Sequence, residues 1–181
     1  MKWKCLKEKY VLRSKWLHVR MDSVLLPNGC QVDDYYVIEK RDVALVCGVT
    51  SDNKILLKQE YRYPIDKVTL ELPGGTFDEK EETPLEAAKR EFLEETGYTA
   101  KTWREIGTFY DYPTKDANKV VVFFAENIEK ISNQNLDDSE DINLSLFPFE
   151  KVIDLIMDGT INVSGSIATI FKVITMIKKT F

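Results

Sequence analysis

The stretch GGTFDEKEETPLEAAKREFLEETGY, residues 74–98, decides how this chain folds. Between Glu71 and Glu95 the sequence holds eight Glu and one Asp against only three basic residues. The whole chain of 181 residues has a net charge of -5, so its acidity is concentrated in this stretch. Carboxylates crowded together are costly unless something positive sits among them. The question is what neutralises them.

The second half of the stretch predicts a helix over residues 83–96. Thr83 and Glu86 fit a capping box, Pro84 suits the first helical position, and Gly97 suits the end of the helix. Two faces follow from an advance of about 100° per residue. We expect one face to pack on a sheet and the other to gather carboxylates; the residues are Leu85, Ala88 and Phe92 on the first, and Glu91, Glu94 and Glu95 on the second.

A solvated acidic face is the simplest explanation of those three glutamates, but the surrounding residues favour a bound cation. Arg90 lies beside them, and the helix follows the glycine-containing loop ELPGG, whose backbone can approach a ligand closely. Oxygen donors of this kind suit Mg²⁺, which prefers carboxylates, waters and substrate phosphates. A divalent ion would also relieve the repulsion between the carboxylates.

Strand-like segments flank the helix on both sides. We expect strands over 3–12, 16–26, 30–39, 42–50, 54–62 and 68–72 before it, and over 100–110, 119–126 and 142–149 after it. Turn signals at 27–29 and 51–53 join neighbouring strands into hairpins. Two further helices near 149–158 and 166–179 are separated by Gly159. This order favours an α+β sandwich over a doubly wound parallel sheet.

The overall composition is that of an ordinary globular domain. Hydrophobic residues make up 44% of the chain and charged residues 30%, enough for one sizeable core. The mild acidity argues against nucleic-acid binding, which needs a basic footprint. We identify no signal peptide and expect no membrane span, because the apolar run near the C-terminus is short and is interrupted by Lys172.

The cysteines and the single histidine limit the classes of catalytic mechanism that the chain can use. Cys5, Cys30 and Cys47 lack CxxC spacing, and we expect reduced, buried thiols in a cytoplasmic protein. His18 is the only histidine, which excludes mechanisms that need two, and no GxSxG motif surrounds a serine.

The quoted stretch resembles the signature of the Nudix hydrolases, which is a Gly, then a Glu, then Arg-Glu-apolar-x-Glu-Glu-x-Gly-apolar. The matching residues are Gly75, Glu82, Arg90, Glu91, Phe92, Glu94, Glu95, Gly97 and Tyr98. Six residues separate Gly75 from Glu82, where the family usually has five. A loop can absorb the extra residue, and Glu81 is an alternative to Glu82.

The resemblance implies an α/β/α sandwich around a mixed β-sheet, with an N-terminal β extension. It also implies hydrolysis of a nucleoside diphosphate linked to another group, assisted by Mg²⁺ or Mn²⁺, with two or more ions. The implied metal ligands are Gly74, through its carbonyl, and Glu91, Glu94 and Glu95. For Glu94, a bridge to the metal through water is the alternative. Arg90 is implied to pair with Glu82 and hold the helix rather than to touch the substrate.

Other parts of the chain resemble the ADP-ribose and sugar-nucleotide branch of the family. QEYRYP (59–64) precedes ELPGG, and Pro113 matches a downstream proline of that branch. We therefore take Arg62, Glu71 and Pro113 as candidate substrate-binding residues, with Arg62 as a phosphate clamp. Arg62 as a surface residue and Pro113 as a plain loop residue are the alternatives. The implied reaction converts ADP-ribose to AMP and ribose 5-phosphate; GDP-mannose or another nucleotide sugar is the alternative substrate.

The general base is assigned by the same resemblance. In that branch a glutamate on a mobile loop accepts the proton of the attacking water, and Glu140 in DDSEDINLSLF (137–147) matches it. A solvated acidic loop is the alternative. The predicted catalytic residues are thus Glu82, Arg90, Glu94 and Glu140. A binding module without activity is a less favoured alternative, because the motif glutamates are all kept.

The resemblance finally implies a homodimer. Residues 1–40 correspond to the extension, which in that branch adds to the sheet and contacts a second subunit, and 41–181 to the hydrolase domain. The candidate interface or base-stacking residues are Trp3, Trp16, Tyr35 and Tyr36, with core packing as the alternative. The expected partners are a small nucleotide and a second subunit, without nucleic acid or membrane.

Overall fold

The computed structural model describes residues 1–178, which fall into two compact units. The first unit comprises residues 1–42 and 110–119, and the second comprises residues 43–109 and the chain from 120 onward. Among the described residues, no helix combines the length and the apolar character needed to cross a bilayer.

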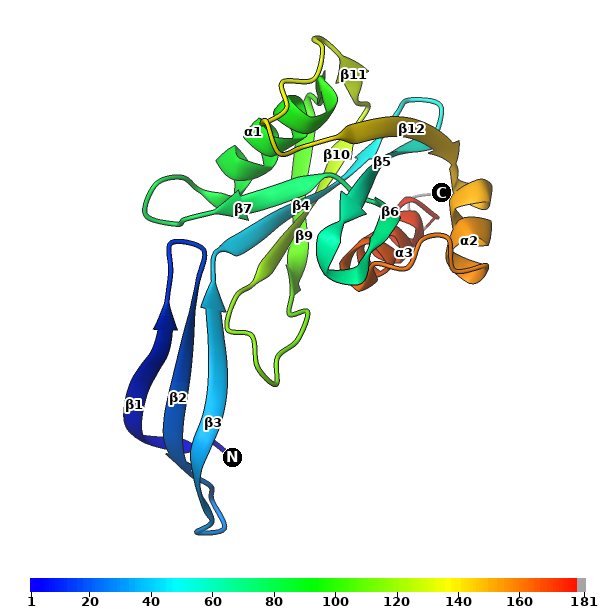
Figure 1. Cartoon of the computed structure of the whole chain (residues 1–181). Helices are drawn as coiled ribbons and strands as arrows, with labels where there is room; N and C mark the ends of the chain where they lie inside the picture. The colour runs from blue at the N-terminus through cyan, green and yellow to red at the C-terminus, as the bar shows by residue number, and fades with distance from the viewer. Residues whose placement is uncertain (179–181) are drawn as a thin grey trace. The chain divides into compact units, whose positions relative to one another are not determined.

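The first unit is a three-stranded antiparallel sheet in the order β1-β2-β3 (Figure 1). Its strands are β1 (Lys4–Arg13), β2 (Leu17–Leu25) and β3 (Gln31–Lys40). The 110–119 segment joins β3 through backbone hydrogen bonds from Ile38 N to Lys115 O at 2.8 Å and from Ala117 N to Ile38 O at 2.9 Å. The expectation that these strands extend the main sheet is wrong, because they hydrogen-bond to one another and form a sheet of their own.

The second unit is built on a seven-stranded mixed sheet. Its main path runs β12-β5-β4-β10-β9, with β6 paired to β5 and β7 paired to β4. The strands are β4 (Asp42–Val49), β5 (Lys54–Arg62), β6 (Lys67–Glu71), β7 (Gly74–Phe77), β9 (Thr102–Phe109), β10 (Val120–Glu126) and β12 (Ile142–Pro148). Strand β10 runs parallel to β4, and β9, β6 and β12 run antiparallel to their partners. The small pair β8 (Tyr98–Thr99) and β11 (Glu129–Lys130) and the 3-10 turn η1 (Tyr63–Ile65) complete the strand regions.

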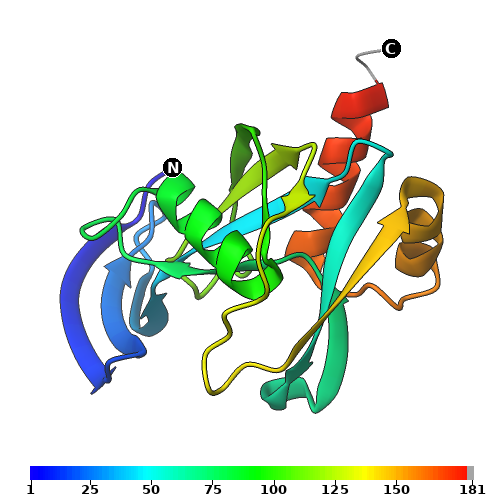
Figure 2. The ribbon, with the colours of Figure 1, turned by 90° about the horizontal axis from the view of Figure 1, so that it is seen from above.

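Helices cover both faces of this sheet (Figures 1 and 2). Helix α1 (Pro84–Thr96) packs on one face, where Phe92 meets Val46 and Phe123 in one apolar cluster. Helices α2 (Phe149–Met157) and α3 (Ser164–Lys178) pack on the other face, in the cluster of Cys47 and Phe124. Alternate residues of β4 and β10 therefore feed opposite layers, and the α/β/α sandwich is confirmed.

Most predicted elements are confirmed to within a few residues, including the capped helix over 83–96. Residue Lys179, at the end of the last predicted helix, lies outside the described residues. Gly74 and Gly75 lie in a strand, β7, that the sequence did not predict.

Two burial predictions are wrong. Leu85 is 37% exposed, while Ala87, Ala88 and Phe92 are fully buried. Leu85 lies in the first turn of α1, and the apolar layer covers the helix only from its second turn on. Cys5 and Cys30 are exposed, because they lie on β1 and in the β2–β3 loop of the small sheet, and Cys47 is buried.

Candidate metal and substrate site

An acidic pocket of about 470 Å³ lies in the second unit, beside α1. Strand β5 lines it with three charged residues, β7 with its two glycines, α1 with its charged face, and the β11–β12 loop with further carboxylates. The residues that matter below are Lys58, Glu60, Arg62, Gly74, Gly75, Arg90, Glu91, Glu94, Glu95, Asp137 and Glu140. The structure thus brings together side chains that lie more than 80 positions apart in the chain.

The ends of helix α1 fix where its glutamates point. The Thr83 hydroxyl accepts a hydrogen bond from Glu86 N at 3.3 Å, and the Glu86 carboxylate accepts one from Thr83 N at 2.8 Å. Gly97 ends the helix with φ of 73°, where a Cβ would meet the Ser132 carbonyl oxygen at 2.2 Å. Both caps satisfy backbone groups that the helix leaves unpaired, so the helix begins at Pro84 and ends at Thr96.

Glu95 is the most enclosed carboxylate of the pocket, at 3% exposure. Its Oε1 lies 2.5 Å from Lys58 Nζ, and its Oε2 accepts a hydrogen bond from Gly74 N at 2.9 Å. Burial raises the pKa of Glu95 to about 7, although Lys58 and the Gly74 N–H both favour the charged form. The predicted metal ligands Gly74 and Glu95 are therefore in direct contact.

Lys58 is a residue that sequence reasoning missed. It is 2% exposed and contacts Glu60 Oε2 at 2.8 Å as well as Glu95. Burial opposes its charged form, but the two carboxylates outweigh burial and raise its pKa. The available signal was the period of two along β5, which places Lys58, Glu60 and Arg62 on one face of the strand.

Glu91 packs directly over Gly75, the second glycine of ELPGG. A Cβ on Gly75 would lie 2.1 Å from Glu91 Cδ, so a larger residue at position 75 would displace this carboxylate. Burial raises the pKa of Glu91, and Arg90, which donates to its Oε1 at 2.8 Å, acts in the opposite direction.

Arg90 joins three carboxylates. It donates to Glu82 at 3.1 Å and 2.5 Å and to Glu94 at 3.2 Å, in addition to Glu91. The extra residue before Glu82 is absorbed in a turn, in which the backbone N–H groups of Glu81 and Glu82 both donate to Asp78 O. Glu82 therefore reaches Arg90 despite the longer spacing, and Glu94 is the most exposed of the helix glutamates that Arg90 contacts, at 40% of its side chain.

The three candidate substrate-binding residues are placed differently. Arg62 lines the pocket, and it donates through Nε to Glu71 Oε1 at 2.9 Å and through Nη1 to Glu60 at 2.7 Å. Glu71 is buried behind it, at 4% exposure. Pro113 lies in the 110–119 segment of the other unit, so its role stays a prediction.

Glu140 lies in the loop between β11 and β12 and lines the same pocket. Its backbone N–H donates to Asp137 O at 2.9 Å, and its carboxylate accepts from Asp137 N at 3.0 Å. The loop thus presents a carboxylate to the pocket opposite the helix glutamates, and Glu140 is close enough to raise the pKa of Glu91.

The charges of the pocket suit hard divalent cations. Its lining includes six carboxylates, from Glu60, Glu91, Glu94, Glu95, Asp137 and Glu140, against the three cations of Lys58, Arg62 and Arg90. One carboxylate oxygen, Glu60 Oε2, is buried and has the Lys58 ammonium, 2.8 Å away, as its partner. Carboxylate oxygens are the donors that Mg²⁺ and Mn²⁺ prefer, so the residues present fit such ions.

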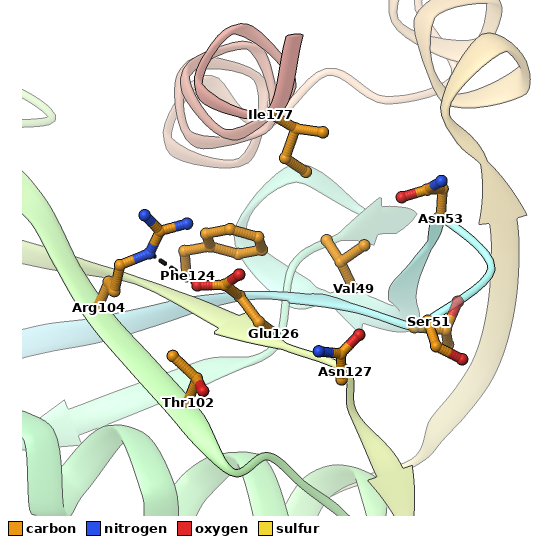
Figure 3. Close-up of a pocket in the computed structure, with 10 residues that line it drawn as sticks. Val49, Ser51, Asn53, Thr102, Arg104, Phe124, Glu126, Asn127 and Ile177 are labelled. Atoms are coloured by element: carbon orange, nitrogen blue, oxygen red, sulfur yellow. Dashed lines mark ion pairs between the residues drawn. The ribbon is translucent and has the colours of Figure 1, made fainter. Parts of the chain in front are cut away.

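Two other groups of residues are less suitable as a metal site. A pocket of about 520 Å³ at the far ends of β4 and β10 is lined by Phe124, Val49 and Ile177, and its Glu126 is paired with Arg104 at 2.7 Å (Figure 3). In the first unit, Cys5, Glu8 and Asp22 lie close together, but Arg20 already binds Asp22 at 2.8 Å. Neither group offers an excess of carboxylates comparable with that beside α1.

Two family profiles match the chain. A profile described as NUDIX domain matches residues 39–163, and one described as nucleoside diphosphate sugar hydrolase N-terminal domain matches residues 3–38.

Individual relatives cover most of the chain. An ADP-ribose pyrophosphatase of Bacillus subtilis is 30% identical over 154 residues, covering 84% of this chain and 82% of its own. A methanol dehydrogenase activator of Bacillus methanolicus is 27% identical, covering 92% and 90%. A solved structure described as an ADP compounds hydrolase superposes with a TM-score of 0.85 over 99% of this chain and 96% of its own; at 22% identity it shows the shared fold.

Proposed function

Because the chain belongs to the Nudix family and is therefore a Nudix hydrolase, we propose that it cleaves the pyrophosphate bond of ADP-ribose to give AMP and ribose 5-phosphate. The single observation that carries the proposal is the excess of carboxylates over cations in the pocket beside α1. Such a pocket repels a bare pyrophosphate and accepts one only with divalent cations. The Bacillus subtilis relative, which is named as an ADP-ribose pyrophosphatase, supports the choice of substrate.

The metal-holding residues in this proposal are Glu91, Glu94 and Glu95, together with the Gly74 carbonyl. They would hold Mg²⁺ or Mn²⁺, with two or more ions in the site. When bound, such ions neutralise charge on the phosphates and help to position the attacking water. The contact of Gly74 N with Glu95 Oε2 supports the proposal, since it keeps β7 and the carboxylate together.

The remaining roles belong to residues around these ligands. Glu140 accepts the proton of the attacking water, supported by its place in the pocket on a loop that faces α1. Arg90 and Glu82 hold the helix glutamates in place, supported by their ion pair. Three of the five N–H donors of Arg62 bind Glu60 and Glu71, and the remaining two are available to a phosphate oxygen.

A substrate panel tests the proposal. The purified chain is assayed with Mg²⁺ and with Mn²⁺ against ADP-ribose, GDP-mannose, UDP-glucose, NADH and a dinucleoside polyphosphate, and the products are identified. We expect ADP-ribose to give the highest kcat/KM, with AMP and ribose 5-phosphate as products. A kcat/KM for ADP-ribose below that for a nucleotide sugar would replace the proposed substrate, and binding without turnover of any compound would indicate a binding module.

Hydrolysis of GDP-mannose or another nucleotide sugar is the second candidate. It is favoured by the match of residues 3–38 to the N-terminal domain of nucleoside diphosphate sugar hydrolases. Both candidates use the same carboxylates and differ only in the groups that recognise the base and the sugar.

We also propose that the chain is a homodimer through residues 1–40, with 41–181 as the hydrolase domain. In support, nine of the ten residues of β1 are exposed. Large apolar side chains are exposed in this unit, namely Trp3, Leu6, Val11, Leu12, Trp16 and Tyr36. Apolar surface of this extent is typical of an interface. The three free cysteines support a cytoplasmic location, where thiols stay reduced.

A further inference from the structure

Lys58 has no part in the hydrolysis described above, although its buried ammonium lines the same pocket. Its Nζ lies 2.5 Å from Glu95 Oε1 and 2.8 Å from Glu60 Oε2. A buried charge is strongly unfavourable unless opposite charges neutralise it. The ammonium is therefore a fixed cation held between two carboxylates, one of which is a proposed metal ligand.

Both carboxylates are aimed at this point by a second donor. Gly74 N donates to Glu95 Oε2 at 2.9 Å, which leaves Glu95 Oε1 to face Lys58. Arg62 Nη1 donates to Glu60 Oε1 at 2.7 Å, which leaves Glu60 Oε2 to face Lys58. The position of Nζ is thus defined by oxygens whose direction does not depend on Lys58 itself.

Glu60 Oε2 is buried, and the ammonium is its charged partner at 2.8 Å. Carboxylate oxygens therefore face Nζ from both Glu60 and Glu95. The same two oxygens could ligate a divalent ion. Oxygen ligands approach Mg²⁺ to about 2.0–2.1 Å, so the two carboxylates would need to close in by less than about 1 Å around it.

We propose that the Lys58 ammonium occupies a divalent-cation position between Glu60 and Glu95, so that this chain carries one positive charge of its active site on a side chain instead of on a bound ion. This inference rests on the proposed metal-dependent hydrolysis and specifies its cation count. In the wild-type chain the ions are held by the proposed ligands Glu91, Glu94, Glu95 and the Gly74 carbonyl, and Glu60 ligates none. The pocket therefore holds one ion fewer than its carboxylates could accommodate.

Counting bound Mn²⁺ tests this inference without reference to activity. The full-length wild type and Lys58→Ala are titrated with Mn²⁺, and the free ion is measured by electron paramagnetic resonance. Alanine removes the charge and opens the space, so Lys58→Ala is expected to bind one more Mn²⁺ per chain than the wild type. Lys58→Met is the matched control, because it removes the charge but fills the space, and it is expected to bind the wild-type number.

Each outcome of the Mn²⁺ titration either supports or overturns the inference about Lys58. Equal Mn²⁺ counts in wild type and Lys58→Ala overturn the inference and leave the proposed function standing, whereas a wild type that binds no Mn²⁺ overturns both. An extra ion in Lys58→Met also overturns the inference, because the ion would then bind although the methionine side chain fills the position of the Lys58 ammonium. If Lys58→Ala is unfolded without metal, recovery of its circular dichroism spectrum on adding Mn²⁺ supports the inference, and failure to recover overturns it.

Discussion

Gly75 and Glu91 show at the residue scale how closely the backbone of β7 approaches the charged face of α1. The three atoms nearest to a Cβ at position 75 all belong to the carboxyl group of Glu91. A side chain there is therefore accommodated by moving the Glu91 carboxylate, and the cost falls on metal binding and not on the fold.

We accordingly expect Gly75→Ala to lower Mn²⁺ affinity and turnover by about 10–100-fold, the effect typical of displacing a ligand's support, with little change in urea unfolding. Gly29→Ala is the control. Gly29 has φ of 86° in the β2–β3 loop, and a Cβ there would meet no atom within 4 Å, so its substitution should lower stability by about 1–2 kcal/mol and leave turnover unchanged. Loss of stability without loss of Mn²⁺ affinity in Gly75→Ala would contradict this account of the site.

The three cysteines give a second prediction at this scale. Burial raises the pKa of Cys47 in the core of the sheet, and Cys5 and Cys30 are exposed. Because the thiolate is the reactive form, Ellman's reagent should titrate two thiols in the native chain and a third only after denaturation. Rapid reaction of all three thiols in the native chain would show that the core around Cys47 is open.

Lys58 marks the limit of what single residues reveal in the sequence. A lysine in a strand is ordinarily interpreted as solvated, and its partner Glu95 lies 37 residues away. The glutamates of α1 were predictable because helical spacing alone makes them neighbours. Lys58, Glu60 and Glu140 reach them only through tertiary packing, and Glu140 was assigned by resemblance and not by any local pattern.

At the scale of elements, helix α1 was predictable almost residue by residue, because its capping box and its terminal glycine are local signals. Strand β7 was not predictable, because two glycines and a threonine carry no strand pattern of their own. Its backbone lies against β4 instead, and a Cβ at Gly74 would meet the Ala44 carbonyl oxygen at 2.3 Å. Leu85 was misassigned for a related reason, since periodicity gives the face of a helix but not how far the sheet extends beneath it.

The cap of α1 can be tested by one substitution. Thr83→Ala removes the hydroxyl that accepts from Glu86 N, and it should lower the free energy of unfolding by about 1 kcal/mol. Thr175→Ala near the C-terminal end of α3 is the matched control, because its hydroxyl donates to Phe171 O and alanine is the better helix former. Urea unfolding should show Thr175→Ala as neutral or stabilising, and equal losses in the two variants would argue against a specific role of the cap.

At the scale of the whole molecule, the order of strands and helices predicted an α+β sandwich, and the family resemblance predicted a mixed sheet between two helical layers. The separate sheet of β1, β2 and β3 was not predicted, because strand patterns show which segments are extended but not which of them pair. The apolar side chains exposed on this small sheet would face water in a monomer, and the proposed dimer would cover them.

The proposed dimer predicts the mass of the particle in solution. Light scattering coupled to size exclusion should give twice the 21.0 kDa of the chain. Val11→Glu, which places a charge on exposed β1, should shift the mass toward one chain, because an unpaired charge in an apolar interface is unfavourable. A wild type that elutes as a monomer at micromolar concentration would contradict the proposed dimer interface.

The release of AMP from ADP-ribose with and without divalent metal tests the central claim most directly. With Mg²⁺ the wild type should produce AMP and ribose 5-phosphate in equal amounts. Excess EDTA should abolish the reaction, and Glu91→Gln should reduce it by more than the roughly 10–100-fold expected for a change outside the ligand set. AMP production that continues undiminished in EDTA, or that Glu91→Gln leaves at the wild-type rate, would show that the carboxylates beside α1 are not there to hold metal.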